Sequence, residues 1–190
     1  MNSIESFKIP LNWHSVLVEG QSYPWHQKPQ RHAKHRDLVG GPRIYRWVFK
    51  NQNGEVQEVY IGQSERFQSR LSGYRTPTKT NPQDTDVIVH DAIVEWEKQG
   101  GTVELQFLEI AAFEVNGQRV DSSTKSLGNH EVRVLLESIA IVTAKSEPYK
   151  LINRLSKNVH RKDIDQLLKN LPLEVRGKVN QLLDEQDQDG

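Results

Sequence analysis

The pattern of apolar and polar positions predicts a β-hairpin near residue 50. Residues 43–49 are rich in β-branched and aromatic side chains, which favour a strand. Asn53-Gly54 follows, and this dipeptide is typical of a tight hairpin turn. Residues 56–61 have the composition of a returning strand. We therefore expect two antiparallel strands in this part of the chain.

Two helices are expected after the hairpin. Phe67, Leu71 and Tyr74 recur at helical spacing and form one apolar stripe, and Ser64 can cap this helix at its start. A polar, proline-containing loop then leads to a second helix from about residue 85, which Gly100-Gly101 closes.

The second half of the chain predicts a strand, a small hairpin and a buried helix. Apolar and polar residues alternate over 102–111, as they do in a strand. A hairpin about Asn116-Gly117 falls within 112–128, a stretch that has the character of an insertion. Residues 129–144 are apolar around most of a helix circumference, which predicts burial. A short extended piece then reaches Asn153.

Length and composition fit one main domain with appended segments. The chain has 190 residues, of which 35% are apolar or aromatic, and its mean hydropathy is −0.70. We expect an N-terminal arm over 1–42, a domain over 43–154, and a C-terminal helical extension with an acidic tail over 155–190. No apolar run could cross a membrane and no signal-peptide profile begins the chain, so a cytoplasmic protein is expected.

Cysteine content and charge narrow the chemistry. Because the chain has no cysteine, any metal must be held by carboxylate, imidazole or backbone groups. The 25 basic and 25 acidic residues cancel overall, but residues 1–80 carry 12 basic against 6 acidic side chains. Residues 81–130 carry 3 against 9, so a basic face is compatible with the neutral total.

Two tripeptides in the predicted hairpin carry a family resemblance. Arg43-Ile44-Tyr45 and Tyr60-Ile61-Gly62 resemble the paired motifs that name the GIY-YIG nucleases. Arg43 stands where the family name has glycine, although Gly40-Gly41-Pro42 keeps a glycine-rich entry into the strand. The order of the predicted elements is also similar to that of the family.

Further residues follow in the order of the family. Arg70 comes eight residues after Gly62, where these enzymes place an arginine, and Tyr74 occupies a position that holds tyrosine or histidine. Glu137 lies in the late apolar helix, and Asn153 follows it. The resemblance covers Gly40 to about Arg154.

The resemblance implies hydrolysis of a DNA phosphodiester that depends on Mg²⁺ or another divalent cation. One of the two strand tyrosines, Tyr60 in preference to Tyr45, would act as general base toward water, while the other orients water or phosphate. Arg70 would contact the phosphate, with Tyr74 one helical turn away. Glu137 would be the single protein ligand of the metal. Asn153 would orient the scissile region or the ligand carboxylate.

Each of these residues also has an ordinary structural interpretation. Strand tyrosines commonly serve packing, and an arginine on a helix is commonly solvated. Glu137 could pair with Arg133 one helical turn earlier, and an asparagine such as Asn153 commonly forms a turn. The scattered histidines have no metal-ligand spacing.

Two basic runs are candidates for contact with the nucleic-acid backbone. A charge run is equally often a solvated surface, so both interpretations stay open. The residues concerned are Arg31, Lys34, Arg36, Lys150, Arg154, Lys157 and Arg161.

The resulting hypothesis is an α/β (α+β) nuclease domain with a small, mainly antiparallel three-stranded sheet flanked by helices. The chain lacks the extra modules that several GIY-YIG enzymes carry. By elimination, we expect a small endonuclease of restriction or phage-defence type, which could form a homodimer. The alternatives are a non-catalytic nucleic-acid-binding module on the same fold, and a plain structural or interaction protein.

Overall fold

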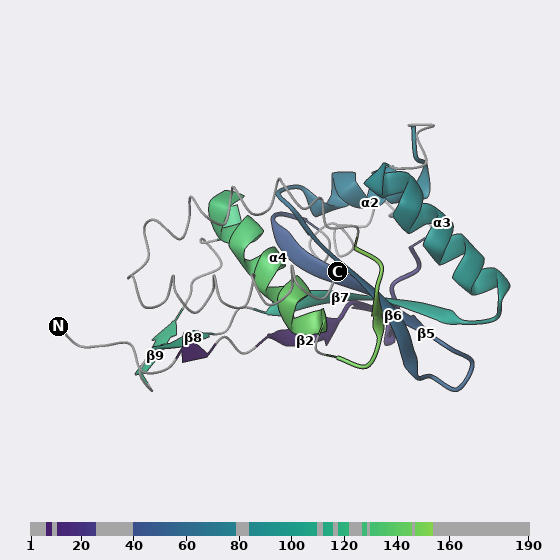
Figure 1. The fold of residues 1–190 in the computed structure, drawn as a ribbon. Coiled ribbons are helices and arrows are strands. Elements are labelled where there is room, and N and C mark those ends of the chain that lie inside the picture. The colour runs from purple at the N-terminus through teal and green to yellow at the C-terminus, as the bar shows by residue number, and fades with distance from the viewer. Residues whose placement is uncertain are drawn as a thin grey trace.

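A mixed five-stranded sheet forms the centre of the fold (Figure 1). The computed structural model describes residues 7–8, 11–25, 40–78, 84–109, 112–115, 118–121, 127–128, 130–145 and 147–153. Within the sheet the strand order is β10-β6-β5-β7-β2. The α+β class is as expected from the sequence.

The three central strands are those that the sequence predicts. β5 (Arg43–Lys50) pairs antiparallel with β6 (Val56–Ser64) on one side and with β7 (Thr102–Glu109) on the other. Their alternating or apolar composition explains why they could be recognised.

Two short edge strands correct the prediction of a three-stranded sheet. β2 (Asn12–Ser15) pairs antiparallel with β7, and β10 (Lys150–Leu151) pairs parallel with β6, so the sheet is mixed. Both strands are too short to show a period in the sequence, because a strand of two to four residues has at most two positions on each face.

The N-terminal segment contributes to the core as well as to the sheet. β3 (Leu17–Val18) and β4 (Gln21–Ser22) form a small hairpin after β2. Val16, Tyr23 and Trp25 are buried in the same cluster as the central strands. The described part of the predicted arm is therefore packed on the domain.

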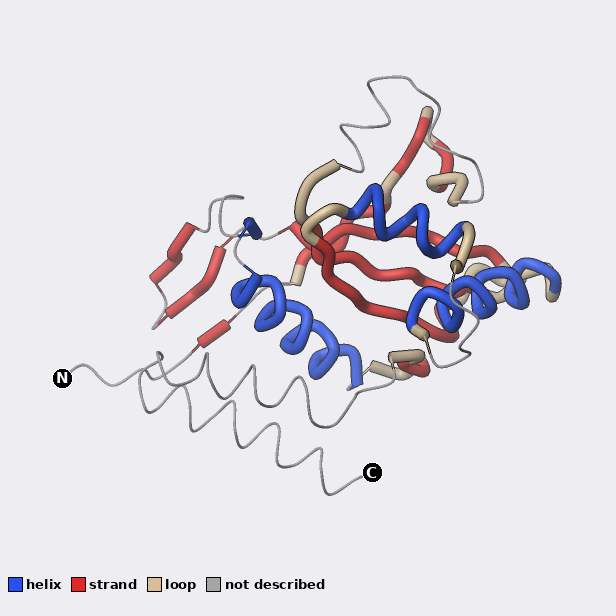
Figure 2. The backbone as a smooth tube through the Cα atoms, turned by 90° about the horizontal axis from the view of Figure 1, so that it is seen from above, coloured by secondary structure: helices blue, strands red, loops and turns tan. Residues whose placement is uncertain are grey.

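Helices cover both faces of the sheet. α2 (Phe67–Arg75) and α3 (Thr85–Lys98) pack on the face that carries Tyr45, Trp47 and Phe49. α4 (His130–Lys145) packs on the opposite face, against Val48, Val59 and Ile61. Figure 2 shows strands of the sheet between α4 and the pair of α2 and α3.

The expected apolar stripe and the expected helix burial are confirmed. Phe67, Leu71 and Tyr74 are the buried residues of α2. On α4, apolar residues are buried against the sheet, among them Leu136, Ala140, Ile141 and Ala144. The prediction that Ser64 caps α2 is wrong, because Ser64 ends β6 and Arg66 stands at the N-cap without a side-chain hydrogen bond.

A second, small sheet lies near one end of the molecule (Figure 1). β8 (Ala112–Val115) and β9 (Gln118–Asp121) pair antiparallel, which confirms the hairpin predicted there, and β1 (Phe7–Lys8) pairs with β8. The helices predicted in 155–190 lie outside the described residues. Among the described helices, none has the length and apolar character needed to cross a membrane.

Candidate active site

Three tyrosines from three elements meet on the face covered by α2. The hydroxyl oxygens of Tyr45 on β5 and Tyr74 on α2 are 2.5 Å apart and share a hydrogen bond. The ring of Tyr60 on β6 lies 6.4 Å from each of the other two rings, measured between centroids. Tyr45 and Tyr74 are sealed from solvent, whereas Tyr60 keeps 8% of its surface exposed. Tyr60 is therefore the tyrosine of this group that can meet water.

Gly62 allows the tyrosines to come together. Tyr45 and Gly62 are directly opposite each other on β5 and β6. A Cβ atom added to Gly62 would lie 2.6 Å from the hydroxyl oxygen of Tyr45 and 3.1 Å from Cε1 of Tyr60. The glycine of the second tripeptide thus leaves the space that the tyrosine of the first tripeptide occupies.

Burial makes these phenols poor acids in the protein alone. Loss of solvation raises the pKa of Tyr45 and of Tyr74 well above the usual value. Burial also raises the pKa of Tyr60 to about 12; hydrogen bonding to Tyr74 lowers it, the negative charge of Glu137 raises it, and the positive charge of Arg70 lowers it. A cation bound near Glu137 would therefore favour ionisation of Tyr60.

Arg70 lies at the rim of this tyrosine cluster, on α2. Its guanidinium carbon is 5.9 Å from the centroid of the Tyr74 ring, a cation–π geometry. Its Nη1 donates a hydrogen bond of 2.8 Å to Oδ1 of Asp86 on α3. Burial lowers the pKa of Arg70, but Tyr74, Tyr45 and Asp86 outweigh that effect and raise it, so the side chain stays a fixed cation. The arginine side chain remains about one-third exposed, which leaves it accessible to a phosphate.

Glu137 is a buried carboxylate beside the same charges. Only 8% of the residue is exposed, and burial raises the pKa of its carboxyl from 4.5 to about 7. A hydrogen bond from the backbone N–H of Gln63 and the charge of Arg70 both act in the opposite direction. Glu137 belongs to α4, which covers the other face of the sheet, but its carboxylate still interacts with the charge of Arg70 on the tyrosine face.

The end of β10 explains how Glu137 reaches Gln63. Asn153 bonds the backbone of Ile61 on the side of β6 that faces β10. Backbone groups point alternately to the two sides of a strand, so the N–H of Gln63 points to that same side, beyond Asn153. Among the described residues no strand pairs with β6 beyond Asn153, so this backbone donor is available to the carboxylate.

Arg133 is not the partner of Glu137. Its Nε donates to Oε1 of Gln63 at 3.0 Å, and its Nη1 donates to the carbonyl oxygens of Leu127 and Gly128 at 2.6 and 3.0 Å. Within the described part of the chain, no ion pair includes Glu137. A buried carboxylate with a raised pKa and no paired cation is suited to bind a metal ion.

Asn153 has a structural position next to the site. Its Oδ1 accepts from the N–H of Ile61 at 2.8 Å and its Nδ2 donates to the carbonyl of Ile61 at 2.6 Å. The side chain therefore continues the pairing of β10 with β6 for one more residue. Both polar groups of Asn153 are occupied by β6, which fixes the strand between Tyr60 and Gly62.

The structure therefore brings together five predicted site residues: Tyr45, Tyr60, Arg70, Tyr74 and Glu137. In the described ranges no cluster of three or more His, Asp or Glu side chains is found, so Glu137 is a single-carboxylate candidate. Lys150 is exposed and pairs with Glu58 at 2.7 Å. The other predicted nucleic-acid contacts lie outside the described residues: Arg31, Lys34, Arg36, Arg154, Lys157 and Arg161.

Sequence reasoning missed two parts of the site. Asp86 has the ordinary appearance of an acidic residue in the first turn of a helix, and only the packing of α3 on α2 places it beside Arg70. The donor at Gln63 belongs to the backbone, so no side-chain pattern could indicate it.

Comparison with known proteins assigns no family to this chain. No family model, curated protein or solved structure matches it significantly.

Proposed function

We propose that this protein is a metal-dependent endonuclease of the GIY-YIG type that hydrolyses DNA phosphodiester bonds, in a restriction or phage-defence role. The observation that carries the proposal is the meeting of three tyrosines, one arginine and one buried carboxylate that has no ion pair among the described residues, which come from β5, β6, α2 and α4. Phosphodiester cleavage needs a base for water, a cation for the phosphate and help for the leaving oxygen. This group of residues can supply each of them.

Arg70 binds the scissile phosphate in this proposal. Its guanidinium is held from two sides, by Asp86 and by the face of the Tyr74 ring. A fixed, permanently charged fork of donors is suited to the oxygens of a phosphate and stabilises the charge that grows on them in the transition state.

Tyr60 accepts the proton of the attacking water. It is the partly exposed tyrosine of the cluster, and Arg70 already lowers its pKa. Tyr45 and Tyr74 orient it, because their hydroxyls are bonded to each other and lie beside its ring. A phenol with a pKa of about 12 requires a further nearby positive charge to act at neutral pH.

Glu137 holds Mg²⁺ or another divalent cation. A carboxylate oxygen is a ligand that Mg²⁺ prefers, and waters and substrate phosphate complete its usual shell. When bound, the metal supplies positive charge that polarises the phosphate and acidifies water. The basic segment with Arg31, Lys34 and Arg36, together with Lys150, Arg154, Lys157 and Arg161, holds the DNA backbone.

The second candidate is a non-catalytic nucleic-acid-binding module on the same fold. The observation that favours it is that the polar groups satisfy one another: Arg70 pairs with Asp86, and the hydroxyl of Tyr45 pairs with that of Tyr74. A cluster with a purely structural role would contain the same kind of mutually hydrogen-bonded pairs.

Plasmid cleavage distinguishes the two candidates. Supercoiled plasmid is incubated with the purified chain and Mg²⁺, with and without EDTA, and nicked and linear products are measured. We expect cleavage that EDTA abolishes, and a loss of about 10³-fold or more in Glu137→Gln, because the change removes a metal interaction of several kcal/mol.

Glu95→Gln is the matched control, since Glu95 is an exposed carboxylate on α3. It should cleave at the parent rate. Gel-shift binding should survive in Glu137→Gln. A parent protein that binds DNA and never cuts it with Mg²⁺, Mn²⁺ or Ca²⁺ would establish the binding module instead.

A further inference from the structure

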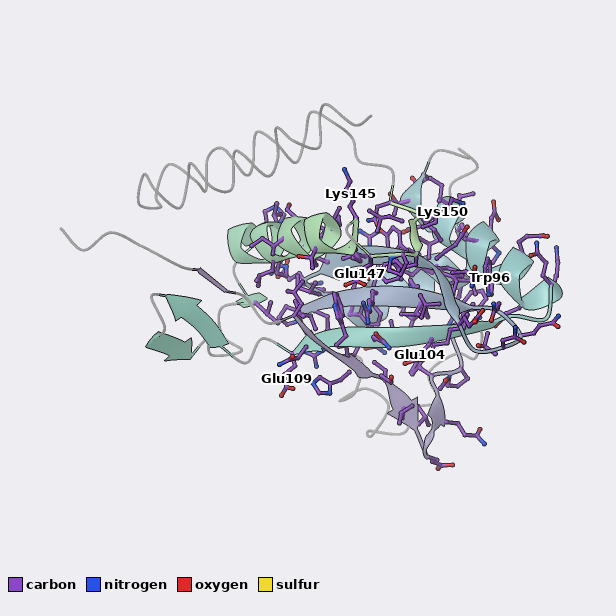
Figure 3. All side chains as sticks on the ribbon, turned by 60° about the horizontal axis from the view of Figure 1, so that its bottom comes forward. Trp96, Glu104, Glu109, Lys145, Glu147 and Lys150 are labelled. Atoms are coloured by element: carbon purple, nitrogen blue, oxygen red, sulfur yellow. The ribbon has the colours of Figure 1, made fainter. Side chains whose placement is uncertain are left out.

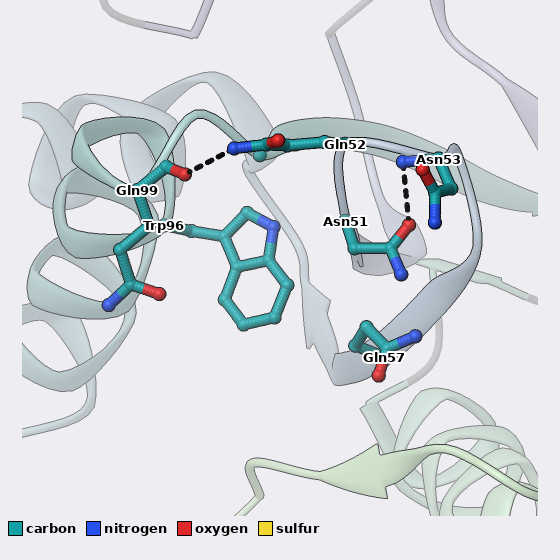
Figure 4. Close-up of a pocket in the computed structure, with 7 residues that line it drawn as sticks. Asn51, Gln52, Asn53, Gln57, Trp96 and Gln99 are labelled. Carbon is teal, nitrogen blue, oxygen red and sulfur yellow. Dashed lines mark hydrogen bonds between the residues drawn. The ribbon is translucent and has the colours of Figure 1, made fainter.

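A pocket lies at the turn of the β5–β6 hairpin, away from the tyrosine cluster. Its volume is about 420 Å³, within the range of small-molecule sites. Tyr45, in the tyrosine cluster, is the third residue of β5, and Lys50, next to the pocket, is its last residue. The two sites are therefore separated along the strand by five residue steps of about 3.3 Å. The lining consists of Asn51, Gln52, Asn53, Gln57, Trp96, Gln99 and Gly101 (Figure 4).

The indole of Trp96 is a fixed platform in this pocket. Its Nε1 donates to the carbonyl of Lys50 at 2.8 Å, and its ring meets the ring of Phe49 edge to face at 5.7 Å between centroids. A Cβ atom on Gly101 would collide with the indole, so Gly101 leaves the space for it. In Figure 3, Trp96 lies on the α3 side of the molecule, away from Lys145 at the end of α4.

The carboxamides around the indole divide into two groups. Asn51 is occupied by the turn, since its Oδ1 accepts from two backbone N–H groups and its Nδ2 donates to Glu55. Gln52 donates to the carbonyl of Gln99 at 3.2 Å. The carboxamides of Asn53 and Gln57 have no partner among the described residues. These two groups are free to donate to and accept from a ligand.

The charges near the pocket disfavour an anionic ligand. No charged side chain belongs to the described lining. Two carboxylates are bonded to lining residues, Glu55 to Asn51 at 2.8 Å and Glu95 to Gln99 at 3.0 Å. Lys98, which precedes Gln99 in the chain, lies 4.0 Å from Glu95 and is paired with it. A phosphate in this pocket would therefore meet negative charge, and no cation lines the pocket among the described residues.

We propose that this pocket binds a neutral saccharide. A sugar ring has a face of C–H bonds, which packs on an indole, and an edge of hydroxyl groups that both donate and accept. Free carboxamides have the same dual character and match vicinal hydroxyls. The rigid ring of Trp96 provides the stacking surface, and Asn53 and Gln57 bind the hydroxyls. This inference is independent of the nuclease proposal.

Calorimetric titration with defined sugars tests the inference. The full-length protein is titrated with maltose, cellobiose and N,N′-diacetylchitobiose, with adenosine as an uncharged nucleobase ligand. We expect at least one disaccharide to bind with a Kd on the order of 1 mM or tighter. We expect no heat above dilution for adenosine.

Variants connect the binding to the pocket. Asn53→Ala and Gln57→Ala each remove one exposed carboxamide and should weaken the sugar about fivefold, as expected for one hydrogen bond. Gln68→Ala removes an exposed carboxamide of α2, outside the lining, and should leave the Kd unchanged. Trp96→Phe keeps an aromatic ring and should weaken sugar binding more than either carboxamide variant does. Circular dichroism checks that this variant is folded.

Three outcomes would overturn the inference: no disaccharide binds at about 10 mM, the two carboxamide variants bind like Gln68→Ala, or adenosine binds and the sugars do not. Glu137→Gln should bind the sugar like the parent chain. Because Asn53→Ala should still cleave plasmid, failure of the sugar site and failure of the nuclease proposal are distinguishable.

Discussion

Arg70 and Asp86 connect α2 to α3 through a hydrogen-bonded ion pair of 2.8 Å between Nη1 and Oδ1. A Cβ atom at Gly73 would lie 2.7 Å from Oδ2 of Asp86, so this glycine leaves room for the carboxylate in its present position. The side chain of Arg70 is 37% exposed and that of Asp86 is 27% exposed, and such pairs contribute little to stability. The pair is therefore better suited to hold the guanidinium in one orientation than to stabilise the fold.

The first prediction follows from this pair. Asp86→Ala should lower the cleavage rate about tenfold to a hundredfold, since a misplaced phosphate-binding group loses transition-state interaction. The free energy of unfolding should fall by less than about 1 kcal/mol. Single-turnover cleavage and urea unfolding measure the two quantities.

Asp91→Asn is the control, because Asp91 is an exposed carboxylate on the same helix. It should leave both quantities unchanged. Asp86→Asn, which keeps an acceptor oxygen for Arg70, should recover part of the rate. If Asp86→Ala cleaves at the parent rate, Arg70 needs no partner for its orientation.

The second prediction concerns the contact of Tyr45 with Gly62. Gly62→Ala should lower the free energy of unfolding by about 1–3 kcal/mol, because the new methyl group overlaps the phenol. The sign is informative, since glycine to alanine at an unstrained strand position is ordinarily stabilising. Chemical denaturation measures the change.

Gly128→Ala is the matched control. No atom of the described residues lies within 4 Å of a Cβ built at Gly128, so this variant should be at least as stable as the parent chain. Equal stability of Gly62→Ala and Gly128→Ala would show that the tyrosines can move aside at no cost.

Strong local signals account for what the sequence predicted of the fold. The Asn53-Gly54 turn, the stripe of Phe67, Leu71 and Tyr74, and the apolar α4 are each confirmed by local structure. Edge strands β2 and β10 form through pairing with distant strands, so neighbouring residues carry no trace of them. Local periodicity cannot indicate a partner that is far away in the chain.

The same distinction applies to the candidate site. The two tripeptides identified Tyr45, Tyr60 and Gly62 in the sequence, because these residues lie on the two strands of a single hairpin. Asp86 joins the site through the packing of α3 on α2, and the N–H of Gln63 joins it at the edge of β6 beyond Asn153. Lys150 remains a predicted phosphate contact, and its exposed ammonium group pairs with Glu58 in the structure.

The third prediction tests the basic N-terminal segment. Replacing Arg31, Lys34 and Arg36 with glutamine should weaken DNA binding, because the variant makes fewer phosphate contacts. Fewer counterions are then released from the DNA on binding. The slope of log affinity against log salt should become shallower by about 0.9 for every contact removed. Fluorescence anisotropy across a salt series measures the slope.

Lys98→Gln serves as the control for overall charge, since Lys98 is exposed on α3 and outside both basic runs. Its slope should equal that of the parent chain. An unchanged slope in the triple variant would remove residues 31–36 from the DNA contacts.

The fourth prediction uses the raised pKa of Glu137. Burial raises this pKa from 4.5 to about 7, so between these values the folded protein binds a proton that the unfolded chain does not. The stabilisation from that proton is complete below pH 4.5 and is lost as pH rises through about 7. Glu137→Gln stays neutral throughout, and its amide oxygen can still accept from the N–H of Gln63.

Relative to the parent chain, the variant should therefore become more stable as the pH rises from 4 to 8. The total change should be roughly 3 kcal/mol, at 1.36 kcal/mol for each pKa unit. Urea unfolding of both proteins across this range measures the difference, and Glu95→Gln should show no such trend. Adding Mg²⁺ at pH 8 should stabilise the parent chain and leave Glu137→Gln unchanged, because only an ionised Glu137 binds the cation. A stability difference that is constant with pH would mean that solvent reaches the carboxylate, and the reason for placing the metal there would be lost.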